Sequence, residues 1–259
     1  MTDVIDRHDV ERILADPAFR VPEADADADL PADRFRARTS RFVNGAVHDA
    51  RRRRLDEFLA SLDVDALARA AATRACTLAP AGSDAVATQV PVACLAEQLG
   101  FAEPDSMPGH VALLAAHYPT GGPSDTADAA LVRLLAAAPP PGRDEHRDDG
   151  VLRVQLLVQA YAATAALITT ALRHPDAADA GVATAELLER ILRETPPVRS
   201  TRRVGPDGNE LVLHLGGPDH DSPPGEARML AFGVGERGCP APAHAVAIAA
   251  AIVDGLRAC

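Results

Sequence analysis

A single cysteine near the carboxyl end of the chain lies between a glycine-rich stretch and an alanine-rich apolar segment. Residues 232 to 241 read FGVGERGCPA, with glycines at positions 233, 235 and 238 ahead of Cys239. Glycines let the backbone turn tightly and approach a flat ligand closely. The apolar pattern predicts a helix over 240–257, and a helix amino terminus favours a thiolate in front of it. The spacing therefore predicts an anionic Cys239, although a lone cysteine at such a place is more often a small buried apolar residue.

The same stretch resembles the heme-binding loop of the cytochrome P450 superfamily, whose pattern is F-G-x-G-x-(H/R)-x-C-x-G. The matching residues are Phe232, Gly233, Gly235, Arg237 and Cys239. The last glycine of the pattern is replaced by Ala241. The resemblance implies that Cys239 is the thiolate ligand of the iron of heme b. It places the other matching residues in the cofactor-binding site.

Further matches to this family occur upstream, in the family's order. In RFVNGAVHDARRRR, His48 and Arg52 reproduce an H-x-x-x-R pattern, which puts both side chains on one face of a helix. In ILRETPPVRSTRRV, Arg203 matches an arginine on the strand that follows the family's helix K. The resemblance implies that these three residues, together with Arg237, pair with the heme propionates. The alternatives are a solvated charged helix face and an exposed charge on a hairpin.

The longest helical pattern contains LLVQAYAATAALITTALRHP, which resembles the family's helix I with its A-G-x-(D/E)-T signature. Thr164 keeps the alcohol of that signature, but Ala163 stands where the acid is expected. The resemblance places both residues at the catalytic position. Without the acid, we expect a non-standard reaction: a peroxide-driven oxidation, an oxidative coupling or dehydration, or a reaction in which the substrate supplies the polar group. The alternative for Thr164 is a hydroxyl bonded to its own helix backbone.

Other departures from the family concern the scaffold. The family's E-x-x-R pattern is broken, because Arg190 stands three residues before Arg193 and Glu189 is one step out of register. The amino-terminal region and the segment between helix K and the heme-binding loop are shortened. These losses put the enclosure of heme in question, and an interface with a second copy is one way to cover what is missing.

The function expected from the resemblance is that of a heme-thiolate oxidoreductase acting on a small-molecule intermediate in bacterial specialised metabolism. No G-x-G-x-x-G pattern follows a strand, so electrons are expected from a ferredoxin-type redox partner, or the oxidant is peroxide. The arginine run 51–54 lies on the helix that forms part of the family's partner-docking face, where an acidic ferredoxin would fit. The alternative is a noncatalytic P450-like accessory protein that supports another biosynthetic enzyme.

The elements that must position these residues are mainly helical. Apolar periodicity predicts helices over 46–62, 64–76, 90–100, 108–117, 124–138, 151–174, 177–194 and 240–257. The sequence RSTRRV, then the turn dipeptide at 207 and 208, then NELVLHL predicts one β-hairpin. Residues 138–150 read as a loop within a domain. We therefore expect a single domain over 1–259 with a mainly α, reduced cytochrome P450-like fold that contains a long central helix and a small β-hairpin.

Composition excludes other classes of protein. The formal net charge of −11 opposes binding to nucleic acid. The amino terminus lacks the pattern of an export signal, and polar residues interrupt the most apolar stretch, so we expect no membrane span and a cytoplasmic protein. The four cysteines show no CxxC pair, which predicts free thiols in a reducing compartment.

Overall fold

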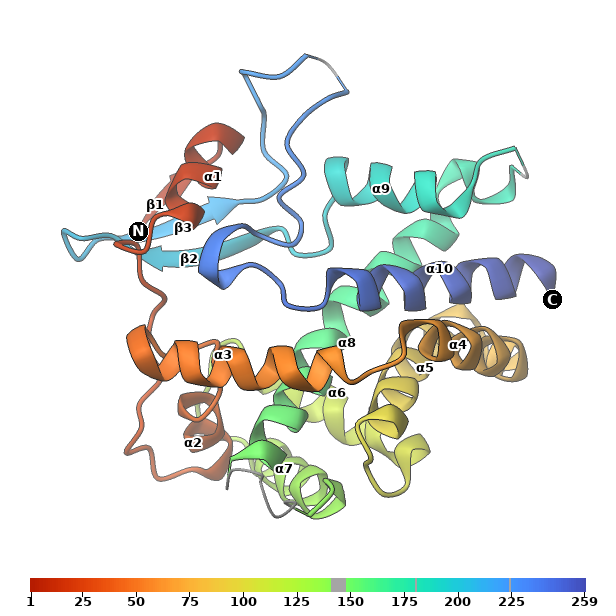
Figure 1. The fold of residues 1–259 in the computed structure, drawn as a ribbon, viewed down its shortest axis with the longest axis horizontal. Helices are drawn as coiled ribbons and strands as arrows, with labels where there is room; N and C mark the ends of the chain where they lie inside the picture. The colour runs from red at the N-terminus through yellow and green to blue at the C-terminus, as the bar shows by residue number, and fades with distance from the viewer. Residues whose placement is uncertain (141–147, 180, 224) are drawn as a thin grey trace.

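Helices make up most of the computed structural model, which describes residues 1–140, 148–179, 181–223 and 225–259 (Figure 1). The α-helices are α1 (Arg7–Ala15), α2 (Pro31–Ala37), α3 (Gly45–Ala60), α4 (Val64–Leu78), α5 (Ser83–Gln98), α6 (Met107–His117), α7 (Asp125–Ala137), α8 (Asp149–Arg173), α9 (Thr184–Glu194) and α10 (Pro242–Ala258). Short 3-10 turns are η1 (Ala79–Ala81), η2 (Pro104–Ser106), η3 (Pro175–Ala178) and η4 (Gly235–Arg237). This confirms the mainly α class.

Most of the helices predicted from periodicity are present, with three differences. Helix α5 begins at Ser83 rather than at 90 and contains Pro91 within it. The predicted helix 177–194 is α-helical only in its second half, after the turn η3. Helices α1 and α2 were not expected, because each is too short for a clear period. Part of the predicted loop at 138–150 lies outside the described residues.

The small sheet contains the predicted hairpin and one further strand. Strands β2 (Ser200–Val204) and β3 (Glu210–His214) pair antiparallel across the turn that contains Gly208, whose φ is +80°. Strand β1 (Thr2–Val4) pairs parallel with β3 on its other edge, which gives the order β1-β3-β2. The predicted hairpin is confirmed, and β1 is a strand that the sequence patterns did not indicate. Helix α1 packs on the sheet. Its residues Val10, Ile13 and Leu14 form a hydrophobic cluster with Leu213 of β3 and with Leu215, which follows this strand.

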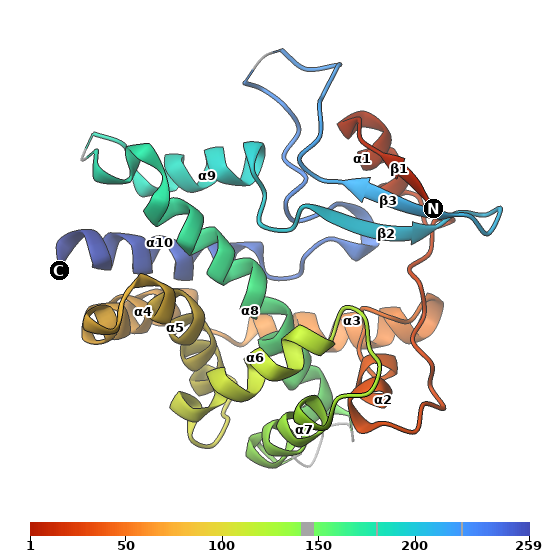
Figure 2. The same cartoon turned by 180° about the vertical axis from the view of Figure 1, so that it is seen from behind.

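Helix α8 runs through the centre of the molecule and connects two hydrophobic clusters. Its first half contributes residues such as Leu157 to a cluster with α3, α5, α6 and α7, and its second half contributes Ile168 to a cluster with α4, α9 and α10. Figure 2 shows α8 in front of α10, running from beside α9 to beside α7. By length and composition α8 could span a membrane, but 56% of its most apolar window is buried among these helices. Its apolar character is that of a core helix.

A disulfide joins α4 to the carboxyl terminus. Cys76 and Cys259, 183 residues apart in sequence, are bonded to each other with a Cα–Cα distance of 6.0 Å. The prediction of four free thiols was therefore wrong for this pair, while Cys94 and Cys239 are free. Helices α4 and α10 approach closely at Gly255, which has no side chain. A Cβ at this position would lie 3.3 Å from the carbonyl oxygen of Ala72.

Candidate functional site

The loop that carries Cys239 is shaped by two glycines with positive φ, Gly233 at +65° and Gly235 at +70°. A Cβ on Gly235 would lie 3.0 Å from the carbonyl oxygen of Leu14, so this glycine lets the loop pack directly on α1. The backbone N–H of Cys239 donates to the carbonyl oxygen of Phe232 at 2.7 Å and closes the loop. The loop geometry follows from residue types that the sequence places there.

Cys239 itself is exposed, which contradicts the alternative of a buried apolar residue. Its Sγ accepts a hydrogen bond from the backbone N–H of Ala241 at 3.4 Å. Desolvation by the surrounding chain raises the pKa of the Cys239 thiol, and the Ala241 N–H and Arg52 only partly oppose this effect. In the free thiol, desolvation therefore outweighs the neighbours that favour the thiolate.

Three of the predicted cations lie close together beside this loop. His48 and Arg52 occupy successive turns of α3, and Arg237 is near enough to lower the pKa of His48, with burial as the larger cause. Arg52 Nη1 donates to the carbonyl oxygen of Gly238 at 2.6 Å. Arg237 donates to the carbonyl oxygen of Val43 at 2.6 Å. His48 is only 4% exposed, so this face of α3 is not a solvated charged face.

Arg203 is a buried cation on β2. Its side chain is 4% exposed, and its guanidinium donates to the carbonyl oxygen of Arg202 at 2.9 Å and to Thr201 Oγ1 at 3.3 Å. Burial lowers the pKa of Arg203 to about 10, and repulsion from Arg237 and Arg41 adds to this shift. Within the described ranges no carboxylate pairs with it. The alternative of an exposed hairpin charge is therefore excluded, and Arg41 is a cation that the sequence patterns did not single out.

Thr164 and Ala163 lie midway along α8. Thr164 is 4% exposed, and in the part of the chain that the structure describes its hydroxyl makes no hydrogen bond. Thr73, Thr77 and Thr88 instead bond to carbonyl oxygens four residues earlier in their helices. The alternative of a backbone-bonded Thr164 hydroxyl is therefore not what the structure shows, and that hydroxyl is available to another group.

Most of the arginine run 51–54 is engaged inside the molecule. Arg51 donates to the carbonyl oxygens of Ala37 and Thr39 at 2.8 and 3.0 Å. Arg52 contacts the Cys239 loop, and Arg54 pairs with Asp149 at 2.6 Å. Of the four arginines, Arg53 alone is exposed, and it donates to the carbonyl oxygen of Asp49 at 3.3 Å. The run therefore offers an acidic partner far less charge than its sequence indicates.

The broken E-x-x-R pattern still forms an ion pair. Arg193 Nη2 lies 2.7 Å from Glu189 Oε1, four residues earlier on α9, because side chains at i and i+4 share a helix face as well as those at i and i+3. Arg193 Nη1 also donates to the carbonyl oxygen of Ala227 at 2.7 Å. Arg7 binds the carbonyl oxygens of Arg193, Gly217 and Arg228. Arginine contacts with α9 and the loops beside it are thus present. Arg228, which lies in the segment before the Cys239 loop, pairs with Asp219 and not with a residue of α9.

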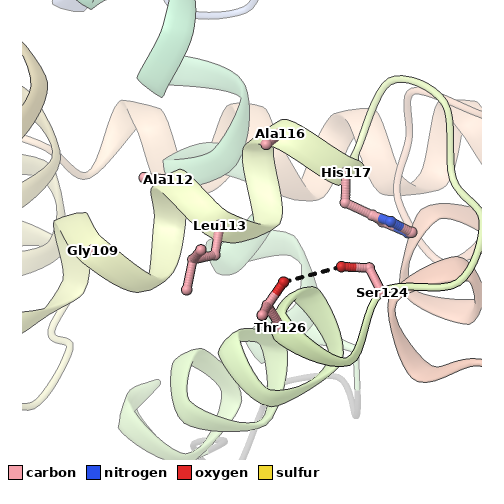
Figure 3. Close-up of a pocket in the computed structure, with 7 residues that line it drawn as sticks. All are labelled: Gly109, Ala112, Leu113, Ala116, His117, Ser124 and Thr126. Atoms are coloured by element: carbon pink, nitrogen blue, oxygen red, sulfur yellow. Dashed lines mark hydrogen bonds between the residues drawn. The ribbon is translucent and has the colours of Figure 1, made fainter.

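Two surface cavities lie away from the Cys239 loop. One of about 400 Å³ lies between α6 and the start of α7, where Ser124 and Thr126 are 3.2 Å apart and Leu113 projects toward them (Figure 3). The other, of about 370 Å³, lies among α2, α7 and α8. Neither contains a residue that the sequence patterns singled out.

Solved structures with the same arrangement of elements identify the fold. P450BioI in complex with hexadec-9Z-enoic acid ligated acyl carrier protein aligns with a TM-score of 0.76 and 16% identity, over 98% of this chain and 83% of that chain. A mutant of P450 EryK in complex with erythromycin B gives 0.72 and 17%, over 98% and 81%. The chain has the cytochrome P450 fold. CxnD, a cytochrome P450 for C–S bond formation in chuangxinmycin biosynthesis, gives 0.71 and 16%, over 97% and 78%. No family model and no curated protein matches the sequence.

The residues on either side of Cys239 pack on the two hydrophobic clusters that α8 connects. Ala241, just after Cys239, packs on the cluster that contains the first half of α8, and Phe232, before it, packs on the cluster that contains the second half. Ala163 and Thr164 lie on α8 between the residues of these two clusters. The sequence patterns missed Gln155 and Gln159 on the same helix, because glutamine has no place in the P450 signature. The sequence signals them only by position, since Gln159 lies one helical turn before Ala163 and Gln155 lies two turns before it.

Proposed function

We propose that this protein is a heme-thiolate oxidoreductase that acts on a small-molecule intermediate of specialised biosynthesis, with the Cys239 thiolate as the iron ligand. The P450 fold and the match of residues 232–239 to the heme-binding pattern support this proposal. EryK bound to erythromycin B and CxnD in chuangxinmycin biosynthesis support the biosynthetic role. When bound, a heme with a thiolate ligand supplies oxidation chemistry driven by dioxygen and electrons or by peroxide.

The observation that carries the proposal is the buried, unpaired charge of Arg203. Burying a cation without an anion costs free energy, so a fold that retains one has a use for an anion at that place. Arg237 and Arg41 repel Arg203 and increase this cost. Heme carries two propionate carboxylates, which would offset it. Arg203, Arg237, His48 and Arg52 are the cations that we propose hold these carboxylates.

The residues around Cys239 fit a thiolate ligand. The Ala241 N–H already points at Sγ, and such a bond stabilises a sulfur anion more than a neutral thiol. Gly233 and Gly235, both with positive φ, give the loop the tight turn that precedes Cys239. Because desolvation raises the pKa of the free thiol, deprotonation of Cys239 would accompany metal binding.

Ala163 and Thr164 determine what proton chemistry the chain can perform. Thr164 Oγ1 has no partner among the described residues, so it can hold a water molecule or donate a proton to a bound oxygen atom. Ala163 offers no carboxylate to replenish that proton. We infer that proton supply from the chain is slow and that a peroxide-driven reaction, which needs fewer delivered protons, suits the site better.

The electron source follows from the state of the arginine run. We infer that docking of an acidic ferredoxin on α3 is weak, because Arg51, Arg52 and Arg54 are occupied within the molecule. This favours peroxide as the oxidant over a ferredoxin-type redox partner. The second candidate function is that of an accessory protein without heme. The exposure of Cys239 is the observation that favours it.

The test compares heme retention among four proteins expressed with added heme. We expect the wild type to show the red-shifted Soret band of a thiolate-ligated heme with carbon monoxide, and Cys239→Ser to abolish it. Arg203→Leu should speed transfer of heme to apomyoglobin about tenfold or more, since a charge-assisted hydrogen bond contributes about 1.5 to 3 kcal/mol. Arg202→Leu is the matched control, because Arg202 is adjacent on β2 but exposed.

The same variants separate a ligand-binding role from a structural one. In the heme-free protein, Arg203→Leu should leave the melting temperature unchanged or raise it, because it removes a buried charge that pairs with no carboxylate among the described residues. A structural Arg203 would instead lower the melting temperature when lost. A wild-type protein without any Soret absorbance would refute the oxidoreductase proposal and favour the accessory function.

A further inference from the structure

Gln159 is an isolated amide on an otherwise apolar part of α8. Residues 154–158 are buried, and Gln159 is the first exposed position that follows them. From 160 to 166, the positions that are not buried are alanines and Tyr161. Tyr161 packs against the hydrophobic cluster of the first half of the helix. Gln159 therefore presents a hydrogen-bonding amide beside small apolar side chains, one helical turn before Ala163.

The backbone N–H of Ser40 sets the orientation of the Gln159 amide, and Gln155 lies between them in a chain of hydrogen bonds. Ser40 N–H, which can only donate, lies 2.9 Å from Gln155 Oε1. Gln155 Nε2 must then be the donor to Ser40 Oγ and to Gln159 Oε1, both at 2.6 Å. Gln155 is fully buried, and these bonds satisfy its whole amide. The oxygen of Gln159 is thus turned inward, and its N–H groups remain without a partner in the described ranges.

The chain of amides also reaches the Cys239 loop. The carbonyl oxygen of Ser40 accepts from Arg237 Nη1 at 3.3 Å, and Arg237 lies two residues before Cys239. The polar contacts of Gln159, Gln155, Ser40 and Arg237 therefore connect α8 to the Cys239 loop. Amides do not ionise, so the outward direction of the Gln159 N–H groups is the same at any ordinary pH.

We propose that Gln159 is a fixed N–H donor that binds an oxygen acceptor, such as a carbonyl or ether oxygen, on the small-molecule substrate. This inference rests on the proposed function, since it assigns the substrate to the space beside Ala163 and Thr164. A site built to donate a hydrogen bond discriminates against an analogue without the acceptor. The substrate class is therefore one with an oxygen close to the carbon that reacts, rather than a plain hydrocarbon.

The experiment uses a pair of probes with the same shape. Cyclohexanone and methylenecyclohexane differ in an oxygen against a CH₂ group, and ligand-observed NMR gives their dissociation constants on protein expressed with added heme. We expect the wild type to favour the ketone by about 2- to 10-fold. Gln159→Leu should bring the ratio to about one, and Gln159→Glu should reverse it. Gln89→Leu, on an exposed glutamine of α5, should leave the ratio unchanged.

Two results would overturn the inference. The first is a ketone preference that survives Gln159→Leu. The second is a Gln159→Leu protein that loses heme faster than the wild type, which would mean that the donor pairs with a heme carboxylate. A wild-type protein without a Soret band refutes the heme proposal alone, because the NMR ratio reports on Gln159 with or without heme.

Discussion

At the scale of single residues, the hydrogen bond and burial of His48 determine which of its ring nitrogens carries a proton. Its Nδ1 lies 3.0 Å from Asp49 Oδ1, and a carboxylate only accepts, so Nδ1 carries the proton. In the neutral ring Nε2 is then an acceptor. Burial lowers the pKa of His48, and Arg237 and Arg52 add to that effect, while Asp49 opposes it. His48 must therefore gain a proton before it can donate to a propionate.

This arrangement predicts a pH dependence of the heme-free protein. Because the folded pKa is below the unfolded value of 6.5, the stabilisation from a neutral His48 is present above pH 6.5 and is lost as the pH falls through the lower folded pKa. The side chain of His48→Gln does not titrate in this range. As the pH falls from 8 to 5, the wild type should therefore lose stability that His48→Gln keeps, and the melting temperature of His48→Gln should rise relative to that of the wild type. A constant difference across that range would show that His48 has an ordinary pKa.

At the scale of elements, the disulfide between Cys76 and Cys259 holds α10 on α4. Helix α10 begins directly after the Cys239 loop, so a constraint on its far end also steadies the loop's anchor. Both cysteines are exposed and therefore open to reductants. The bond closes a chain segment of 183 residues, and in the chain-entropy model a long closed loop gives a large stabilisation.

We predict that reduction of this bond lowers the melting temperature by about 5 to 15 °C, from a typical 2–4 kcal/mol for a disulfide and the size of this chain. Dithiothreitol should produce this loss in the wild type and in Cys239→Ser. Cys76→Ser should already melt at the lower temperature and not respond to the reductant. If Cys76→Ser melts like the oxidised wild type, the pair contributes no stability.

The elements show which parts of the structure the sequence could predict. Helices with several turns, such as α3 and α8, have enough periodic positions to be recognised, and the Asp-Gly turn identified the hairpin. Strand β1 has three residues and is defined by its partner β3, more than 200 residues later, so no local pattern predicts it. The pairing of Cys76 with Cys259 is equally non-local. The use of the arginine run inside the fold depends on where α2 and α8 pack, which composition does not reveal.

At the scale of the whole molecule, the shortened P450 fold leaves its candidate site accessible. Cys239 on the loop and Ala162 and Gln159 on α8 are all exposed. The polar side chains that α8 contributes there, Thr164 and Gln159, do not ionise at ordinary pH. Water can therefore reach the site from solvent, but no carboxylate at the Ala163 position directs protons to a particular atom.

We therefore predict that the identity of residue 163 controls the oxygen-dependent reaction and not the peroxide-dependent one. A positioned acid contributes about 10² to 10⁴ in rate to a proton transfer, and a peroxide oxidant reduces the need for that transfer. Ala163→Glu and Ala163→Asp should raise the ratio of product formed to reductant consumed with a generic ferredoxin system, and should leave the peroxide-driven rate within about twofold. Ala162→Glu, one position away on the same helix, is the control for added charge alone. Tight coupling in the wild type on an apolar substrate would show that ordered water already delivers the protons, and the molecule would then need no substrate oxygen and no peroxide to turn over.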